Sequence, residues 1–191
     1  AASRMKPADT GWLVYAESTN TSMSLADFDQ AILALENTTN IKGYLGQQNL
    51  YGLLYFAASR MKVVEGSWRV YAKGQGGSIS LQDFDTAIGA LTSMPNISKH
   101  IGEANFYDML QFVIFRMELK ADGKWYIYPT DNPETVMALE TFDRAVGALG
   151  EQLGKYPQLR DFWVNPENKD IFWKLLVWTA SIAYADSEGK L

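Results

Sequence analysis

One six-residue segment occurs twice in this chain without a single difference, and this repetition constrains the fold more than any other feature. Ala-Ala-Ser-Arg-Met-Lys stands at residues 1–6 and again at 57–62, which is 56 positions later. Phe115-Arg116-Met117 stands at the corresponding place further along. Self-similarity at a fixed period is typical of repeat proteins, in which each copy buries its apolar face against a neighbour. The chain is therefore predicted to consist of copies of one unit.

Two further blocks repeat in the same order. A tryptophan followed at two and three positions by Val or Ile and by Tyr occurs at Trp12, Trp68 and Trp125. The pattern Leu-x-x-Phe-Asp-x-Ala-x-x-Ala-Leu occurs at 25–35, 81–91 and 139–149. Chance does not produce three ordered blocks in register. We predict one repeat domain over 1–191, with units at about 1–48, 49–104 and 105–169 and a closing helix at 170–185.

The pattern within each unit predicts a helix, an arm and a second helix. Apolar residues at i, i+3 and i+4 run from Leu50 to Met61 and again from Phe106 to Met117. The second helix begins at a capping-box spacing, Ser24-x-x-Asp27 in the first copy. The arm alternates apolar and polar residues, as a small hairpin does. The fold class is therefore predicted to be mainly α, an all-α helical bundle with short hairpin-like arms.

Residues that recur at equivalent places are interpreted first as answers to a repeated packing need. The tryptophans are expected to seal each arm against its helix pair. The repeated arginines and aspartates are expected to tie the two helices of a unit together through an ion pair or a carbonyl cap. These structural residues are Trp12, Trp68, Trp125, Arg4, Arg60, Arg116, Asp29, Asp85 and Asp143.

The first helix of each unit carries more aromatic residues than one packed face requires. A helix that is apolar nearly all round is either central in a bundle or lines something. The favoured interpretation is the buried middle of a bundle. The alternative is a cavity for a flat apolar molecule such as a pigment, lipid or sterol, or a groove for a partner helix. The candidate ligand-binding residues are Tyr51, Tyr55, Phe56, Tyr107, Phe112, Phe115, Phe172, Trp173 and Trp178.

Composition excludes several functions. The net charge of −5 argues against nucleic acid as a partner. The absence of cysteine and the single histidine, His100, leave no ordinary metal site, and no cofactor is expected. Asp27 and Asp29 are two positions apart, which turns them to different faces of a helix and makes them a poor acid–base pair. No apolar run is long enough to cross a membrane. The chain is predicted to be acidic, aromatic-rich, soluble and not an enzyme.

Two short stretches resemble known families. Residues 76–84 resemble the second half of an EF-hand loop, but Ala72, Gly74 and Gly76 stand where that family has oxygen ligands, so calcium binding is not implied. Residues 24–35 are similar to a helix start in the peridinin–chlorophyll proteins, which are repetitive all-helical pigment carriers. This second resemblance covers about a dozen of the 191 residues, and the first helix of each unit has no histidine of the kind that would help hold a chlorophyll.

The leading functional hypothesis is a non-catalytic interaction or assembly subunit. It would dock on a partner protein through exposed aromatic residues of the arms or of the stretch 156–166. The alternative is a carrier of an apolar ligand held between aromatic-rich helices, and a hydrolase ranks below both. The tripeptides at Asn20, Asn37 and Asn96 match the glycosylation pattern, and the start at Ala1 resembles a processed end. A secreted or organelle-lumen location is therefore expected.

Overall fold

The computed structural model describes residues 4–9, 11–15, 22–45, 50–72, 77–99, 106–128 and 136–156. The chain divides into two units, Ala1–Gly89 and Ala90–Leu191, and each is described by itself. The statements below concern the described residues.

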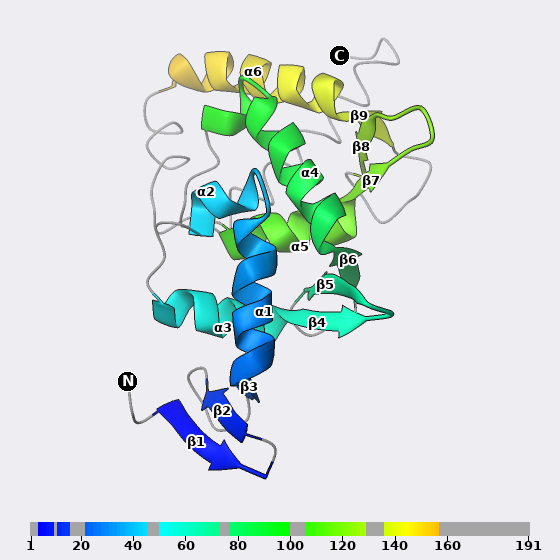
Figure 1. The fold of residues 1–191 in the computed structure, drawn as a ribbon. Coiled ribbons are helices and arrows are strands. Elements are labelled where there is room, and N and C mark those ends of the chain that lie inside the picture. The colour runs from blue at the N-terminus through cyan, green and yellow to red at the C-terminus, as the bar shows by residue number, and fades with distance from the viewer. Residues whose placement is uncertain are drawn as a thin grey trace. The chain divides into compact units, whose positions relative to one another are not determined.

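The first unit contains two antiparallel sheets, each of three strands in sequential order (Figure 1). Each sheet leads directly into a helix, and a helix also precedes the second sheet. In chain order the elements are β1 (Met5–Ala8), β2 (Gly11–Tyr15), β3 (Ser22–Ser24), α1 (Leu25–Glu36), α2 (Ile41–Leu45), α3 (Leu50–Arg60), β4 (Met61–Val64), β5 (Ser67–Tyr71), β6 (Ser78–Ser80) and the first part of α4 (Leu81–Ser93).

The second unit contains the end of α4 and a third sheet with the same strand order. A helix again precedes this sheet, and another follows it without a break. Its elements are η2 (Ile97–Lys99), α5 (Phe106–Arg116), β7 (Met117–Leu119), β8 (Trp125–Ile127), β9 (Met137–Ala138) and α6 (Leu139–Gly154).

Strand register places equivalent residues of the three sheets in the core. Val14, Val70 and Ile127 are buried toward the C-terminal end of the central strands. Each lies between one residue of the first strand and one of the third: Met5 and Met23, Met61 and Ile79, or Met117 and Met137. Because side chains alternate across a strand, these trios face one side of each sheet. The core of each sheet therefore begins at this row.

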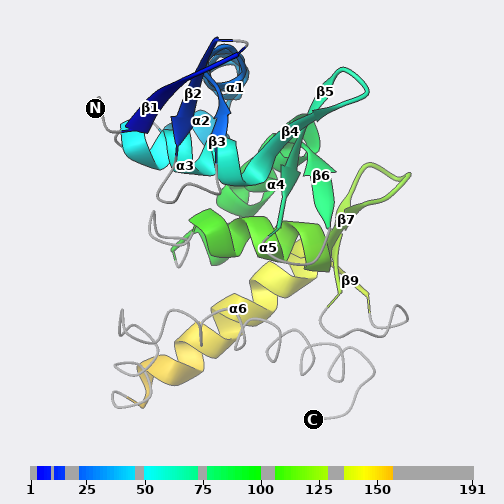
Figure 2. The ribbon, with the colours of Figure 1, turned by 90° about the horizontal axis from the view of Figure 1, so that it is seen from below.

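Helices cover the apolar side of the sheets. In the first unit α3 packs against α1 and against β2 and β3, and Figure 2 shows α3 running alongside the β1–β3 sheet. In the second unit α6 packs on β8 and β9. The Phe112 and Phe142 rings there stack with centroids 6.3 Å apart and planes inclined by 22°. Aromatic pairs at such distances add to the stabilisation that burial itself supplies.

Serine side chains start two of the helices that follow the sheets. Ser24 Oγ accepts a hydrogen bond from the Asp27 backbone N–H over 2.9 Å and donates to Asp27 Oδ2 over 2.7 Å. Ser80 and Asp83 make the same two contacts over 2.9 and 2.6 Å. These contacts satisfy amide hydrogens that a helix leaves unpaired in its first turn. The expected capping spacing is thus present at both positions.

The prediction of a mainly α fold is wrong, and so is that of an all-α helical bundle. The described residues form three small antiparallel sheets together with six α-helices, which is a mixed α/β architecture. Each arm is a three-stranded sheet, because the serine segments at 22–24 and 78–80 pair with the central strand before the helix starts. Strands of three residues are too short for an alternation of period two to be recognised in the sequence. Met61 and Met117 continue the apolar pattern of the preceding helices, although they lie in the strands β4 and β7. The predicted closing helix at 170–185 lies outside the described residues.

Candidate functional site

In each of the three sheets, the outer end of the first two strands is a candidate interaction surface. Two positions before the buried row, the register pairs a tryptophan with an apolar residue of the first strand. Since the offset is two residues, these pairs face the same side of the sheet as the core trio but lie beyond it. We call them the hairpin tips: Pro7 with Trp12, Val63 with Trp68, and Leu119 with Trp125.

Each hairpin tip leaves a large apolar side chain in water. The exposed fractions are 51% for Trp12, 55% for Val63 and 44% for Leu119. Trp68 is half-buried, and Trp125 is only 8% exposed. A single exposed apolar residue is ordinary on a protein surface. Here the equivalent cross-strand pair of all three sheets has an exposed apolar member, so this exposure is a property of the sequence repeat. The tips are therefore candidates for contact with another molecule.

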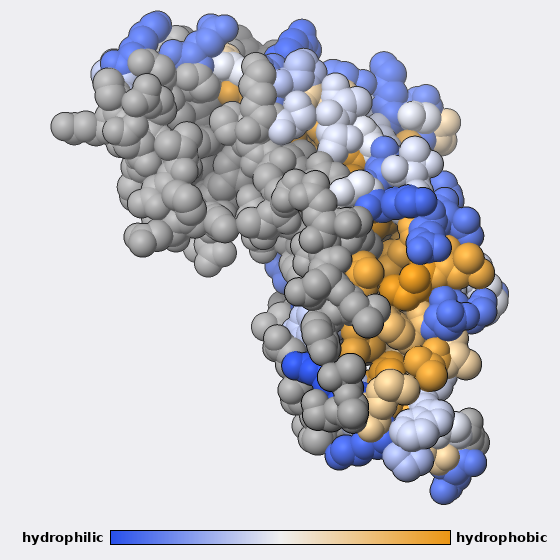
Figure 3. All heavy atoms as spheres, turned by 60° about the vertical axis from the view of Figure 1, so that its left-hand side comes forward, coloured by the Kyte–Doolittle hydropathy of each residue, from blue (hydrophilic) through white to orange (hydrophobic). Residues whose placement is uncertain are grey.

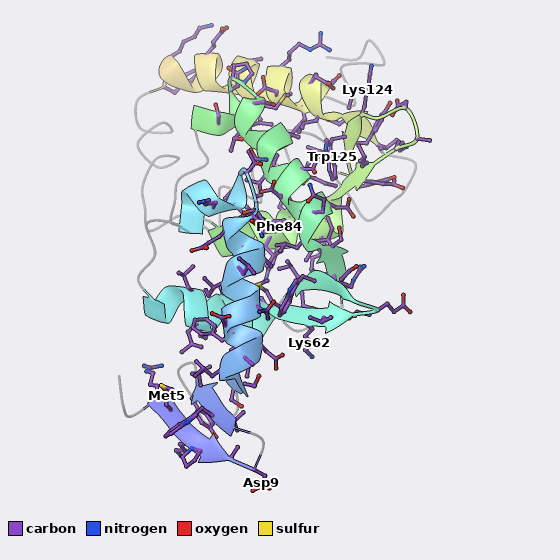
Figure 4. The ribbon with its side chains drawn as sticks, viewed as in Figure 1. Met5, Asp9, Lys62, Phe84, Lys124 and Trp125 are labelled. Atoms are coloured by element: carbon purple, nitrogen blue, oxygen red, sulfur yellow. The ribbon has the colours of Figure 1, made fainter. Side chains whose placement is uncertain are left out.

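The opposite face of the first two sheets carries a lysine beside a tyrosine ring. Lys6 Nζ lies 5.3 Å from the centre of the Tyr15 ring, and Lys62 Nζ lies 5.5 Å from that of Tyr71. These are cation–π distances. Figure 4 labels Lys62 on β4 and Asp9 at the turn of the β1–β2 hairpin. The first two hairpins thus carry the tip residues on one face and a lysine on the other.

The third sheet carries hydrogen-bonded phenols on its polar face. The Tyr126 hydroxyl donates to Asp122 Oδ2 over 2.8 Å, and the Tyr128 hydroxyl donates to Glu118. The Lys124 backbone N–H donates to Asp122 Oδ1 and, with Tyr126, lowers the pKa of the Asp122 carboxyl. The same bonds to carboxylates raise the pKa of Tyr126 and of Tyr128. Both phenols stay protonated near neutral pH, so this group provides fixed donors and no acid–base pair.

A second repeated device joins each turn to the helix of the following repeat. Asp85 Oδ1 accepts hydrogen bonds from the backbone N–H groups of Asn40 and Ile41, each over 2.8 Å. Asp85 Oδ2 accepts from the backbone N–H of Thr39 over 3.2 Å and from Asn40 Nδ2 over 3.3 Å. The same Asn40 amide donates to the Asp85 carbonyl over 3.0 Å. A carboxylate has about four acceptor sites, and the turn occupies four.

The second unit repeats this contact. Asp143 Oδ1 accepts from the backbone N–H groups of Asn96 and Ile97, each over 2.9 Å, and Asp143 Oδ2 accepts from Asn96 Nδ2 over 3.0 Å. Asp143 is 4% exposed, and Asp85 is 5% exposed. Hydrogen bonds to a buried charge are stronger than neutral ones, and they offset the cost of removing it from water. We call each set of contacts an asparagine clasp.

Glycine makes room for the asparagine of each clasp. A Cβ built on Gly89 would lie 2.6 Å from Asn40 Nδ2, and a Cβ built on Gly147 would lie 2.7 Å from Asn96 Nδ2. Neither distance is possible without movement of the amide. The asparagine side chain therefore lies directly on the helix backbone, at a place where only glycine leaves enough space.

Sequence reasoning singled out the clasp aspartates but missed their partners. Asp85 and Asp143 hold turns, and Asp29 is exposed on α1. Two features of the sequence indicate the partners of these aspartates. An Asn-Ile pair recurs at 40–41 and 96–97, and glycine stands at 89 and 147, where the first repeat has Leu33. Arg4, Arg60 and Arg116 are half-buried beside the strands β1, β4 and β7. The proposed tie between these arginines and the aspartates stays a prediction.

The aromatic residues proposed as ligand-binding have differing surroundings. Phe56 and Phe112 are buried, Tyr55 is half-buried, and Phe115 is 42% exposed. Tyr51 lies in α3 and Tyr107 in α5. Phe172, Trp173, Trp178 and His100 lie outside the described residues. The hypothesis of an apolar ligand between these helices stays a prediction.

Among the described residues, no group of three or more His, Cys, Asp or Glu side chains could hold a metal ion. No helix in the part of the chain that the structure describes is long and apolar enough to cross a membrane. Comparison of the chain with protein-family models, with curated proteins and with solved structures finds no match.

Proposed function

We propose that this protein is a non-catalytic interaction subunit that docks on a partner protein through its hairpin tips. One observation carries the proposal. At the same strand register, three sheets leave Trp12, Val63 and Leu119 between 44% and 55% exposed on an otherwise core-facing side. Large apolar side chains in water favour association, because burying them releases free energy.

The size of this effect can be estimated for Trp12. An aromatic side chain buries roughly 150–250 Å² when fully covered, and each Å² contributes about 25 cal/mol. About half of that area is still exposed, so covering Trp12 would contribute on the order of 2–3 kcal/mol before the costs of association. Tryptophan is also among the residues that most often dominate binding interfaces. The expected partner presents an apolar pocket with a polar rim.

The test compares three forms of the full chain, each mixed with an extract of the protein's natural source. The tip variant combines Trp12→Ser, Val63→Ser and Leu119→Ser. The control variant changes the opposite face of two of these three hairpins through Lys6→Ser and Lys62→Ser. Each form is tagged and followed by sedimentation under native conditions.

The parent and the control variant should sediment within a larger assembly, and the tip variant should sediment as the free chain. Circular dichroism of the purified proteins verifies that all three are folded. Identical sedimentation of the three forms would count against docking through the tips.

A further inference from the structure

The outer edge of the second sheet is exposed along most of its length. β4 is the first strand in the order β4-β5-β6, and Figure 1 shows it at the outer side of the sheet. Val63 is 55% exposed, Val64 is 38% exposed, and Lys62 is exposed beside them. The strand at the other edge, β6, is half-buried at each of its three residues. β4 is therefore the open edge of this sheet.

The main-chain groups of Val63 point outward from this edge. Paired residues of an antiparallel ladder alternate between pairs that exchange hydrogen bonds and pairs that do not. The Ala72 N–H donates to the Gly77 carbonyl over 3.0 Å, so Ala72 and every second residue before it direct their main-chain groups toward β6. Trp68 is one of these residues, and its partner in β4 is Val63. The Val63 N–H and C=O therefore point away from β5 and can bond a further strand.

The three sheets differ at this edge position. In β1 the position belongs to Pro7, which has no N–H. In β7 it belongs to Leu119, which points outward because the next residue, Lys120, donates its N–H to the Lys124 carbonyl over 3.0 Å. Proline is one of the residues by which natural sheets block their edges. The edges of β4 and β7 are therefore open to a further strand, and the edge of β1 is blocked.

A pair of cations indicates what kind of strand fits β4. Lys62 and Arg69 are directly opposite each other in the register, so their side chains share a face. Arg69 donates to the Ser78 hydroxyl and carbonyl, each over 3.0 Å, and neither cation forms an ion pair with a described residue. Like charges in such a pair repel each other, and a carboxylate on an added strand would relieve that repulsion. β7 has Glu118 in the place of Lys62, so the same carboxylate would be repelled there.

Exposed apolar residues alone do not make such a site. Figure 3 shows apolar residues gathered where α1 lies, but the main chain of a helix interior is hydrogen-bonded within the helix. At β4, exposed apolar side chains coincide with outward main-chain groups and with two cations. A partner can therefore be held there by its backbone and selected by its side chains.

We propose that an extended segment of the partner protein joins the second sheet as a fourth strand beside β4. The segment alternates apolar and acidic residues. One of its apolar residues lies opposite Val63, exchanges two main-chain hydrogen bonds with it and covers its side chain. An acidic neighbour in the segment faces Lys62. This inference rests on the proposed function and deepens it, because it names the part of the partner that is recognised.

The probe is a capped peptide, Thr-Glu-Val-Glu-Val-Glu-Thr, which as a strand has valines on one face and glutamates on the other. Titration into the isotope-labelled full chain should shift the amide resonances of residues 62–64. The control peptide has lysine in place of each glutamate and should bind at least about fivefold more weakly, because it brings further cations to Lys62. Salt at about 0.15 M screens the net charge of −5 of the chain, so the comparison reports the local charges.

One substitution tests the main-chain bonds. Val63→Pro removes the outward N–H and keeps an apolar side chain at the hairpin tip, and Pro7 shows that the equivalent place in the first sheet accommodates proline. This variant should bind the peptide at least about tenfold more weakly. The matched control, Val63→Ile, keeps the N–H and should bind as the parent does. A peptide methylated at both valine nitrogens removes its own donors and should lose as much affinity for the unaltered chain.

Charge variants separate attraction from repulsion. An exposed ion pair contributes little, so Lys62→Ser should weaken peptide binding about twofold or less, and the control variant of the sedimentation test keeps its partner. Lys62→Glu gives β4 the charge that Glu118 has in β7 and should weaken binding about fivefold.

Three results would overturn the proposal. One is the absence of shifts at residues 62–64 at millimolar peptide. Another is equal affinity for the glutamate and lysine peptides. The last is an affinity that neither Val63→Pro nor methylation of the peptide changes.

The added strand and the docking of the tips can fail separately. In the sedimentation test, Val63→Pro should move toward the free chain if the partner adds a strand to β4. An assembly that loses the tip variant but keeps Val63→Pro would support docking through the tips and contradict the added strand. An assembly that keeps both would contradict both.

Discussion

Substitution of Gly89 by alanine should destabilise the protein, although alanine is the better helix former. In an unconstrained helix interior this change stabilises by about 1 kcal/mol. Here the new Cβ would lie 2.6 Å from Asn40 Nδ2 and 2.9 Å from Asn40 Cγ. The amide must therefore move away from Asp85.

The magnitude follows from the two hydrogen bonds that this movement breaks. Asn40 Nδ2 donates to the Asp85 carbonyl over 3.0 Å and to the Asp85 carboxylate over 3.3 Å. A neutral bond contributes about 1 kcal/mol and a bond to a charged group about 1.5 kcal/mol or more. Loss of both, less the gain in helix propensity, gives a net destabilisation of about 1.5 kcal/mol.

The effect should change sign when the asparagine side chain is absent. In an Asn40→Ala background the amide is gone, so Gly89→Ala should stabilise by about 1 kcal/mol. Urea denaturation followed by circular dichroism of the parent, the two single variants and the double variant completes a double-mutant cycle. Gly147→Ala with Asn96→Ala repeats the experiment in the second unit. A Gly89→Ala protein that is more stable than its parent would refute the reasoning.

Three further outcomes are expected. Asp85→Asn removes the charge that four donors share, so urea denaturation should show a loss of about 2–3 kcal/mol, and an unchanged midpoint would contradict the role of the carboxylate. Trp125→Ala should cost about 3–5 kcal/mol because this side chain is 8% exposed, whereas Trp12→Ala should cost under about 1 kcal/mol, and equal losses would show that exposure does not decide the effect. Glu118→Gln should lower the pKa of Tyr128, measured by ultraviolet absorbance titration, because the bond to the carboxylate favours the protonated phenol. That bond stabilises the parent below the ordinary tyrosine pKa of about 10, and its contribution is lost as the pH rises through the raised pKa.

Part of the fold follows from local pattern. The helices α3 and α5 were predicted because apolar residues recur every three or four positions from Leu50 and from Phe106. The starts of α1 and α4 follow from the Ser-x-x-Asp spacing, since the serine hydroxyl satisfies amides of the first turn.

The sheets were missed because their strands are short and adjoin helices directly. Met61 continues the apolar period of α3 and yet begins β4, where it pairs with Val70. Ser80 ends β6 and also caps α4, so one residue carries two signals. Strand pairing depends on residues distant in the sequence, and a local period does not report it.

The candidate site was predictable in kind but not in detail. Recurrence alone pointed to the tryptophans, but exposure falls from 51% at Trp12 to 8% at Trp125, and the surrounding structure decides that difference. The clasp depends on Asn40 reaching a helix 45 residues away. Such a contact becomes visible only when the Asn-Ile pair and the glycine are considered together.

The clasps bear on how the polypeptide matures as it leaves the ribosome. The donors at Thr39, Asn40 and Ile41 precede Asp85 by 46, 45 and 44 residues. Synthesis adds on the order of 5–20 residues per second, so this early segment waits several seconds for its carboxylate. During that interval water satisfies the amides of the turn, and translation speed beyond residue 41 sets how long the turn waits for its permanent acceptor.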